Sequence, residues 1–329
     1  MPAAAAFGLP LSSILILPFF IPMAILTRRS FLQISAAAGV AAATAPFASR
    51  LGATPAPFAR SGAPRLRLSL TAMSFSRYFT INRGKAVAVA PDKALDVFKF
   101  VDYCAAHGCD AEPTTYFFAE ETDEFLARLR RHCFLRGVSI TSAPISNNFS
   151  LPKGPAREQD IAHVKRWIDR AVVLGAPQVR VFVGQTDASS REEADKLVIA
   201  GLEECGDYAG RHGIILCVEN HDVTNTAARL LPIIKAVKNS FVGLNLDPGM
   251  AVADPYQEFA ACLPYAVNIH VKTDLNVAGK RQPMDFPRIA RLLRDGGYQG
   301  WVALKYESQE DPYVAVPRTL QEMKPLFAG

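Results

Sequence analysis

The chain has 329 residues, half of them hydrophobic and 20% charged, a composition typical of globular proteins that excludes a fibrous or intrinsically disordered chain. The formal net charge of +5 falls to about +1 without four arginines near the N-terminus, so no nucleic-acid partner is expected. The length allows one large domain, since an α/β barrel commonly needs about 250 residues. The four arginines are Arg28, Arg29, Arg50 and Arg60.

The N-terminal segment is expected to be a leader and not part of the fold. The stretch TRRSFLQISAAAGVAAATA (27–45) places an arginine pair and Phe-Leu before an alanine-rich run, and it resembles a twin-arginine export signal. Export by this route predicts a periplasmic protein. We expect residues 1–62 to be a leader and tether that are disordered or cleaved, and residues 63–329 to form the folded domain.

Two further expectations concern the residues around this signal. The apolar stretch LSSILILPFFIPMAIL precedes the arginine pair, where a positively charged region should come first, so translation is expected to start at Met23. Pro18 and Pro22 interrupt this stretch, which is also short for a bilayer, so no stable membrane span is expected. Residues 54–64 are rich in proline and are expected to act as a tether.

The cysteines of the chain do not have the paired spacing of a metal site. We expect them to be small buried hydrophobic residues. Twin-arginine substrates fold before export, so reduced thiols are compatible with an exported protein, and a disulfide between Cys104 and Cys109 is the alternative. The six are Cys104, Cys109, Cys133, Cys205, Cys217 and Cys262.

From residue 65 onward, short apolar runs alternate with amphipathic helical stretches, one of which, DIAHVKRWIDRAVVLGA, is expected to end at Gly175. No glycine-rich phosphate-binding loop follows any of the runs. Eight βα units of this size predict a closed (β/α)8 TIM barrel in preference to an open, doubly wound sheet. The expected strands are residues 65–73, 109–115, 138–144, 178–184, 214–220, 241–247, 267–272 and 301–307.

Polar residues gather at the carboxyl ends of the last four expected strands, where the active sites of TIM barrels lie. Two carboxylates and an imidazole from three adjacent strands predict a site for a divalent metal, such as Mn, Mg, Zn or Co. Taken singly, the carboxylates could be turn residues and the histidine a core residue. Three such coincidences at one end of a barrel explain the pattern less well than a shared metal site does. The three residues are Glu219, Asp247 and His270.

Four segments carry a resemblance to a known family: LCVENHD, VGLNLDPGM, VNIHVKTD and GGYQGWVALKYES. They are similar to the signatures of strands five to eight in the xylose isomerase-like barrel superfamily, the sugar phosphate isomerase/epimerase group. That family holds a metal with Glu, Asp, His and Glu, and the resemblance maps the first three to Glu219, Asp247 and His270. The fourth position is Lys305, whose ammonium cannot bind a metal.

Three arrangements around Lys305 are open. Glu307, on the same face of the strand, could replace the missing ligand. Alternatively, the other three ligands could hold a metal with water, while a neutral Lys305 serves as acid or base. In the third arrangement the ammonium replaces the metal, with its charge balanced by Glu219 and Asp247. A simpler explanation is that the Lys305 side chain extends to solvent at the mouth of the barrel.

The resemblance implies a reaction that removes a proton α to a carbonyl and passes through an enediolate, with or without assistance from a metal. Glu219 is the expected base, and Lys305 or Glu307 would supply the second proton-transfer group. The residues expected to bind substrate are His221, Lys272, Asn220 and Glu112.

A small carbohydrate is the expected partner. Export favours an unphosphorylated sugar, because phosphorylated sugars are mainly cytosolic, and the leading function is a sugar isomerase or epimerase. The alternatives are a lyase or hydrolase of oxidised (keto) glycosides and a catalytically silent carbohydrate-binding barrel, which Lys305 favours. The loop at residues 74–89 is long enough to act as a lid, from which Arg77, Tyr78 and Arg83 could face a sugar or an acid.

Overall fold

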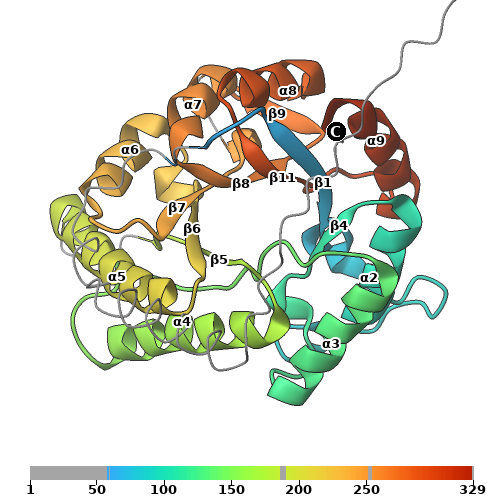
Figure 1. Ribbon diagram of the computed structural model, residues 1–329, viewed down its shortest axis with the longest axis horizontal. Coiled ribbons are helices and arrows are strands. Elements are labelled where there is room, and N and C mark those ends of the chain that lie inside the picture. Colours follow the sequence, from blue (N-terminus) through green and yellow to red (C-terminus); the bar gives the residue numbers. More distant parts are fainter. Residues whose placement is uncertain (1–57, 59, 186–189, 251–253, 328–329) are drawn as a thin grey trace, which may run out of the picture. The chain divides into compact units, whose positions relative to one another are not determined.

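The computed structural model describes residue 58 and residues 60–185, 190–250 and 254–327 (Figure 1). The predicted export signal and the expected start at Met23 lie outside the described residues. Part of the expected tether is described, and it lies against the barrel: the guanidinium of Arg60 packs 4.6 Å from the centre of the Tyr298 ring. None of the helices in the described ranges is long and apolar enough to cross a bilayer.

A parallel sheet of seven strands curls around the centre of the molecule (Figure 1). Its strand order is β4-β1-β11-β8-β7-β6-β5, so the first and last strands of the chain are neighbours. This pairing of chain ends is the arrangement of a closed α/β barrel. The strands are β1 (Arg65–Thr71), β4 (Asp110–Glu112), β5 (Gln178–Val181), β6 (Ile215–Glu219), β7 (Val242–Leu246), β8 (Ala266–Val271) and β11 (Gln299–Leu304).

An extended segment closes the gap between β4 and β5, and it corresponds to the strand expected at residues 138–144. On one side, Thr141 N–H donates to the carbonyl of Ala111, and Ile140 forms a parallel bridge to Ala111. On the other side, Ala143 N–H donates to the carbonyl of Gln178. The pairing is too short for a regular strand, but it completes the ring. The predicted (β/α)8 barrel is therefore confirmed.

In the ranges that the structure describes, eight α-helices surround the strands (Figure 1). Their ends follow from local sequence: the Asp96 carboxylate accepts hydrogen bonds from two backbone N–H groups at the start of α2, and Gly175 ends α4 at φ 78°, as predicted. The helices are α2 (Val97–His107), α3 (Asp123–Arg136), α4 (Pro155–Leu174), α5 (Arg191–Arg211), α6 (Ala227–Ala236), α7 (Pro255–Cys262), α8 (Phe286–Asp295) and α9 (Pro312–Phe327).

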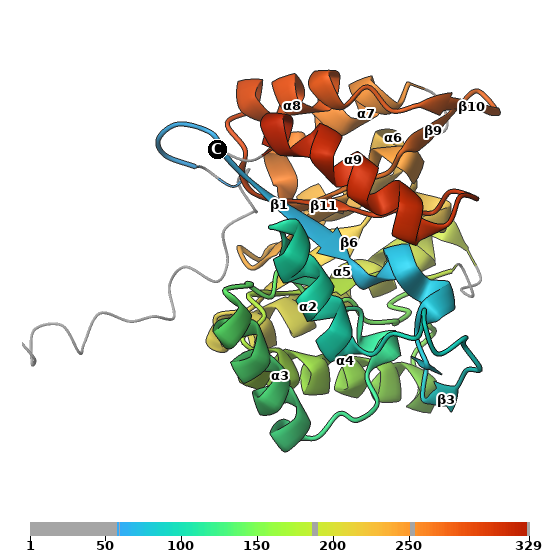
Figure 2. The same ribbon diagram turned by 90° about the vertical axis from the view of Figure 1, so that its right-hand side faces the viewer.

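Two antiparallel hairpins interrupt the βα pattern, and both lie at the end of the barrel where the strands finish (Figure 2). The first follows β1 and the second follows β8. The hairpin strands are β2 (Ile81–Asn82), β3 (Lys85–Ala86), β9 (Asp274–Val277) and β10 (Lys280–Pro283). Short 3₁₀ turns complete the connections: η2 (Ala72–Tyr78), η3 (Thr115–Phe117), η4 (Asp222–Thr224), η5 (Pro248–Met250) and η6 (Leu263–Tyr265).

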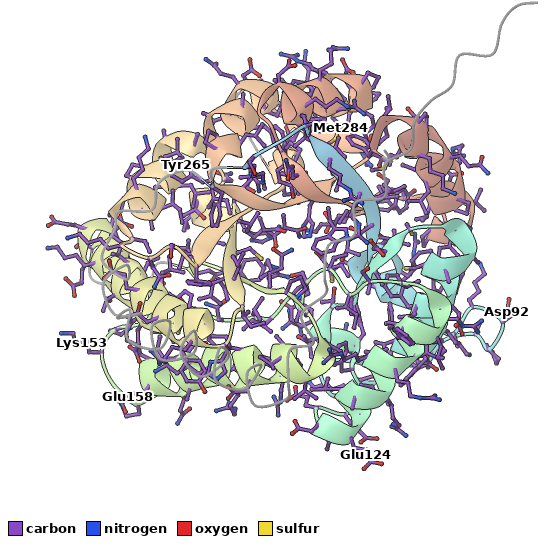
Figure 3. All side chains as sticks on the ribbon, viewed as in Figure 1. Asp92, Glu124, Lys153, Glu158, Tyr265 and Met284 are labelled. Atoms are coloured by element: carbon purple, nitrogen blue, oxygen red, sulfur yellow. The ribbon has the colours of Figure 1, made fainter. Side chains whose placement is uncertain are left out.

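Side chains fill the ring of strands and the layer between strands and helices (Figure 3). The six cysteines belong to this interior. All are buried and free, as predicted for small hydrophobic residues. Cys104 and Cys109 do not form the alternative disulfide, and the Cys109 thiol instead points to the Cys104 carbonyl at 3.7 Å.

Candidate active site

Four strands bring Glu219, Asp247, His270 and Lys305 together at the carboxyl end of the barrel. Glu219 is the last residue of β6, Asp247 follows β7, His270 lies near the end of β8 and Lys305 follows β11. All four side chains are buried. These positions are one rim of the ring, where TIM-barrel enzymes carry out their chemistry.

Lys305 lies between the two carboxylates. Its Nζ donates to Glu219 Oε1 at 2.8 Å and to Asp247 Oδ2 at 3.2 Å, and the side chain is only 8% exposed. Burial alone would lower the pKa of this lysine, but Glu219 and then Asp247 outweigh it and raise the pKa above its ordinary value. The Lys305 side chain is thus a charged ammonium that is enclosed by carboxylates and does not extend to solvent.

A second buried cation, Arg180 on β5, contacts the other oxygen of Glu219. Its Nε lies 3.0 Å from Glu219 Oε2, while Nη1 donates to the Ile145 carbonyl at 2.9 Å. Burial opposes the charge of Glu219, but Lys305 and Arg180 together hold the pKa of this carboxyl well below its usual range. Arg180 is absent from the residues predicted from the sequence, although an arginine inside the expected strand QVRVFVG is the same kind of signal as Lys305 inside WVALK.

His270 is hydrogen-bonded to a third buried carboxylate, Glu112 on β4. His270 Nε2 lies 2.8 Å from Glu112 Oε1, and Asn268 donates to Glu112 Oε2 at 2.9 Å. Burial disfavours an imidazolium, but Glu112 and then Glu219 raise the pKa of His270 to about 9. Glu112 is predicted to bind substrate at the rim; its side chain is fully buried, it lines the cavity, and its carboxylate is placed to orient the imidazole.

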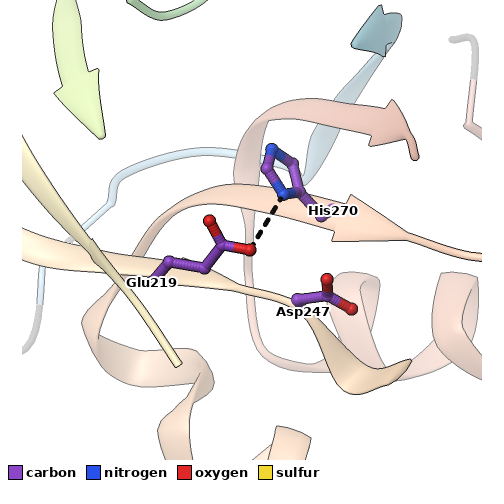
Figure 4. A group of neighbouring side chains, drawn as sticks. All are labelled: Glu219, Asp247 and His270. Atoms are coloured by element: carbon purple, nitrogen blue, oxygen red, sulfur yellow. Dashed lines mark ion pairs between the residues drawn. The ribbon is translucent and has the colours of Figure 1, made fainter. Parts of the chain in front are cut away.

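Glu219, Asp247 and His270 have ligand atoms of the right types and positions to hold a metal ion (Figure 4). Within the part of the chain that the structure describes, one atom from each residue lies within 4.8 Å of the others. The Glu112 contact to the far nitrogen of His270 is also common around protein-bound metals. By donor type alone, the set is suited to a divalent cation.

Lys305 contradicts this fit. Its ammonium donates to the same two oxygens that would bind the ion, and charges of +1 and +2 at 4 Å repel by roughly 8 kcal/mol at an effective dielectric constant of 20. In addition, a protonated His270 has no electron pair to give. These residues therefore do not fit a divalent cation while Lys305 stays charged and in place.

The remaining predicted residues divide between the cavity and its surroundings. Glu307 lies at the mouth, 2.6 Å from Lys272 Nζ and 3.9 Å from Lys305 Nζ, so it does not replace the missing ligand. Lys272 also contacts Asp247 at 3.3 Å and faces a neighbouring hollow of about 250 Å³. Asn220 is held by backbone: its amide donates to the Asp247 carbonyl and accepts from the Asp247 N–H.

A cavity of about 450 Å³ opens above this centre, large enough for a small-molecule ligand. Among the predicted residues, Glu112, Glu219, His221, His270, Lys305 and Glu307 line it, whereas Lys272, Asn220 and Asp247 are not among the described lining residues. Arg83, at the tip of the first hairpin, also lines the cavity, so it is placed to face a sugar or an acid. Arg77 instead donates to the carbonyl of Glu310, just before α9, and the Tyr78 ring packs against Tyr313 of α9.

A family model described as a xylose isomerase-like TIM barrel matches residues 101–323 of the chain. A search of curated proteins finds no match.

Solved structures share the fold at low sequence identity. D-psicose 3-epimerase in the presence of D-fructose is 18% identical, with a TM-score of 0.63 over 80% of this chain and 100% of that one. A xylose isomerase-like TIM barrel protein from Mycobacterium smegmatis in complex with magnesium is 21% identical, with a TM-score of 0.62 over 80% and 96%. The 3-keto-D-glucoside 4-epimerase from E. coli is 15% identical, with a TM-score of 0.59 over 79% and 100%.

Proposed function

Because the chain belongs to the xylose isomerase-like TIM barrel family, we propose that it is an exported isomerase or epimerase of an unphosphorylated carbohydrate, in which Lys305 supplies the positive charge of the site. Its structural neighbours include epimerases of D-psicose and of a 3-keto-D-glucoside. The observation that carries the proposal is the buried Lys305 ammonium, bonded to Glu219 and Asp247 beneath the cavity. Export is proposed from the arginine pair of the leader.

The reaction begins with removal of a proton from the carbon next to the sugar carbonyl. Glu219, which lines the cavity as a carboxylate, accepts this proton, the electron pair of the C–H bond forms a C=C bond, and the π pair of the carbonyl moves to its oxygen. The resulting enediolate is negatively charged. Donation of a proton by the Lys305 ammonium to the other face of the same carbon gives an epimer, after which the proton on Glu219 passes to Lys305 across their hydrogen bond. Return of the proton from Glu219 to the neighbouring carbon gives an isomer.

Charge stabilisation has to supply most of the rate enhancement. The lowered pKa of Glu219 makes it a weak base. An ammonium 2.8 Å from that base, fixed in place before substrate arrives, stabilises the enediolate oxygen without reorganisation. Arg180 keeps Glu219 ionised and aligned from the other side.

Hydrogen isotope exchange tests the proposal. The protein is incubated in D2O with a panel of unphosphorylated keto-sugars and keto-glycosides, and products are analysed by NMR and mass spectrometry. We expect deuterium at the carbon next to the carbonyl and a rearranged sugar with the composition of the substrate. Release of an aglycone would instead identify a lyase or hydrolase, and binding without exchange would identify a silent carbohydrate-binding barrel; either result would overturn the proposal.

A further inference from the structure

The first hairpin holds Arg83 in an unfavourable backbone conformation. Arg83 and Gly84 form the two-residue turn between β2 and β3, with φ values of 50° and 73°. Turns with two positive φ values favour Asn-Gly or Asp-Gly, because a larger side chain in the left-handed region costs about 1–2 kcal/mol. An arginine at this position suggests that its side chain is needed there.

The side chain of Arg83 has a defined position over the cavity. Its guanidinium lies 3.8 Å from the centre of the Tyr116 ring, and its backbone N–H donates to the Tyr116 carbonyl at 2.6 Å. Both residues line the cavity of the candidate active site. Stacking on an aromatic ring fixes the plane of a guanidinium and leaves its edge N–H groups available to a ligand.

Every carboxylate among the described lining residues has a cationic partner. Glu219 pairs with Lys305 and Arg180, Glu112 with His270, and Glu307 with Lys272. Arg83 has no carboxylate within ion-pair distance in the described parts of the chain. Among the described lining residues, the charges at the centre of the cavity are balanced, and Arg83 adds a positive charge at its mouth.

The lining of the cavity contains a further polar group. Thr114 is completely buried and lines the cavity, and its hydroxyl has no hydrogen-bond partner among the described residues. A buried hydroxyl without a partner is costly, so such a group commonly meets a ligand or an ordered water. Thr114 lies two residues before Tyr116, on which Arg83 stacks.

We propose that Arg83 binds an oxyanion of the substrate, and that the natural substrate is a keto-sugar acid whose carboxylate meets this guanidinium. The substrate class rests on the proposed function, because the reacting carbonyl must lie at Glu219 and Lys305 while the acid group reaches the mouth. A guanidinium binds carboxylate or phosphate through two parallel N–H bonds. The carboxylate is assigned because the proposed substrate is unphosphorylated.

Calorimetric titration with three ligands tests the assignment: D-fructuronate, D-fructose and D-fructose 6-phosphate. We expect the wild-type protein to bind D-fructuronate about tenfold or more tightly than D-fructose, the gain from one charge-assisted contact. Arg83→Asn should reduce this ratio to near one without loss of thermal stability, since Asn tolerates a positive φ. The matched control is Lys85→Asn, which removes one charge from the same hairpin outside the cavity lining and should preserve the ratio.

Each other result has a definite meaning. Equal binding of D-fructuronate and D-fructose by the wild type, or an unchanged ratio in Arg83→Asn, would overturn the inference, even if D-fructose exchanges its hydrogen and the proposed function stands. Arg83-dependent preference for D-fructuronate without isotope exchange would support the oxyanion site and remove the proposed function. Preference for D-fructose 6-phosphate, lost in Arg83→Asn, would keep the oxyanion site and overturn the assignment to a carboxylate.

Discussion

Replacing Lys305 by glutamate is expected to create a divalent-metal site. The substitution removes the ammonium that donates to Glu219 and Asp247 and supplies a fourth ligand beside Glu219, Asp247 and His270. An ammonium that repels the cation is replaced by a carboxylate that attracts it, so the affinity for Mn²⁺ should rise by at least about a thousandfold relative to the wild type. Calorimetric titration and elemental analysis after dialysis measure this gain.

A matched variant separates the loss of the charge from the gain of the ligand. Lys305→Met keeps the length of the side chain but offers neither an ammonium nor a carboxylate, so we expect a much smaller increase in affinity. If Lys305→Glu is poorly folded without metal, added Mn²⁺ should raise its melting temperature, because binding and folding are linked. If the metal affinity and melting temperature of Lys305→Glu stay equal to those of the wild type, the conclusion that the Lys305 ammonium excludes a divalent cation from this site is wrong.

Glu219→Gln is expected to slow α-hydrogen exchange by a factor of about a thousand or more, since the amide cannot accept the substrate proton. Glutamine keeps the shape of the side chain and can still accept the hydrogen bond from Lys305. The measurement is the rate of deuterium incorporation into the keto-sugar that the wild type turns over, together with a circular dichroism spectrum that reports the fold.

Glu307→Gln is the control for this experiment. Glu307 lines the same cavity, but it lies 3.9 Å from Lys305 Nζ and is paired with Lys272 at the mouth. We expect its removal to change the rate less than tenfold. A large loss in Glu307→Gln combined with a near-normal rate in Glu219→Gln would transfer the role of base to Glu307.

Periodicity was sufficient to predict the barrel, because each strand and helix of a (β/α)8 fold repeats the same burial pattern. Residues 138–144 were the exception. Their apolar pattern correctly predicts an extended and buried segment, but the backbone pairs only briefly with each neighbour. Length and regularity of pairing depend on tertiary packing and are not contained in local periodicity.

At the site, the sequence predicts which residues lie at the strand ends, but it does not predict which of their side chains contact one another. Glu219, Asp247, His270 and Lys305 were expected at one rim because parallel strands end together. The sequence is the same whether Lys305 is an ammonium that replaces a metal or a neutral amine beside a metal. The choice between these roles needed the distances from Lys305 Nζ to Glu219 and Asp247. Arg180 follows the same strand rule but lies on the fourth expected strand, outside the last four, on which the candidate residues were sought.

Side-chain direction beyond a strand end was also hidden from the sequence. Lys272 and Asn220 follow β8 and β6 closely, yet Lys272 turns to a neighbouring hollow and Asn220 bonds the backbone of Asp247. The residues after a strand no longer alternate strictly between two faces, so the period of two does not assign their direction.

The protonation state of Lys305 can be measured directly by ¹H–¹⁵N NMR of the lysine side chains, with Lys305→Met to assign the signal. Because Glu219 and Asp247 raise its pKa above the ordinary value of 10.5, we expect the Nζ of Lys305 to keep the chemical shift of a hydrogen-bonded ammonium at pH 10.5, where exposed lysines are about half deprotonated. A neutral amine at pH 7 to 8 would contradict the replacement of a metal by this side chain.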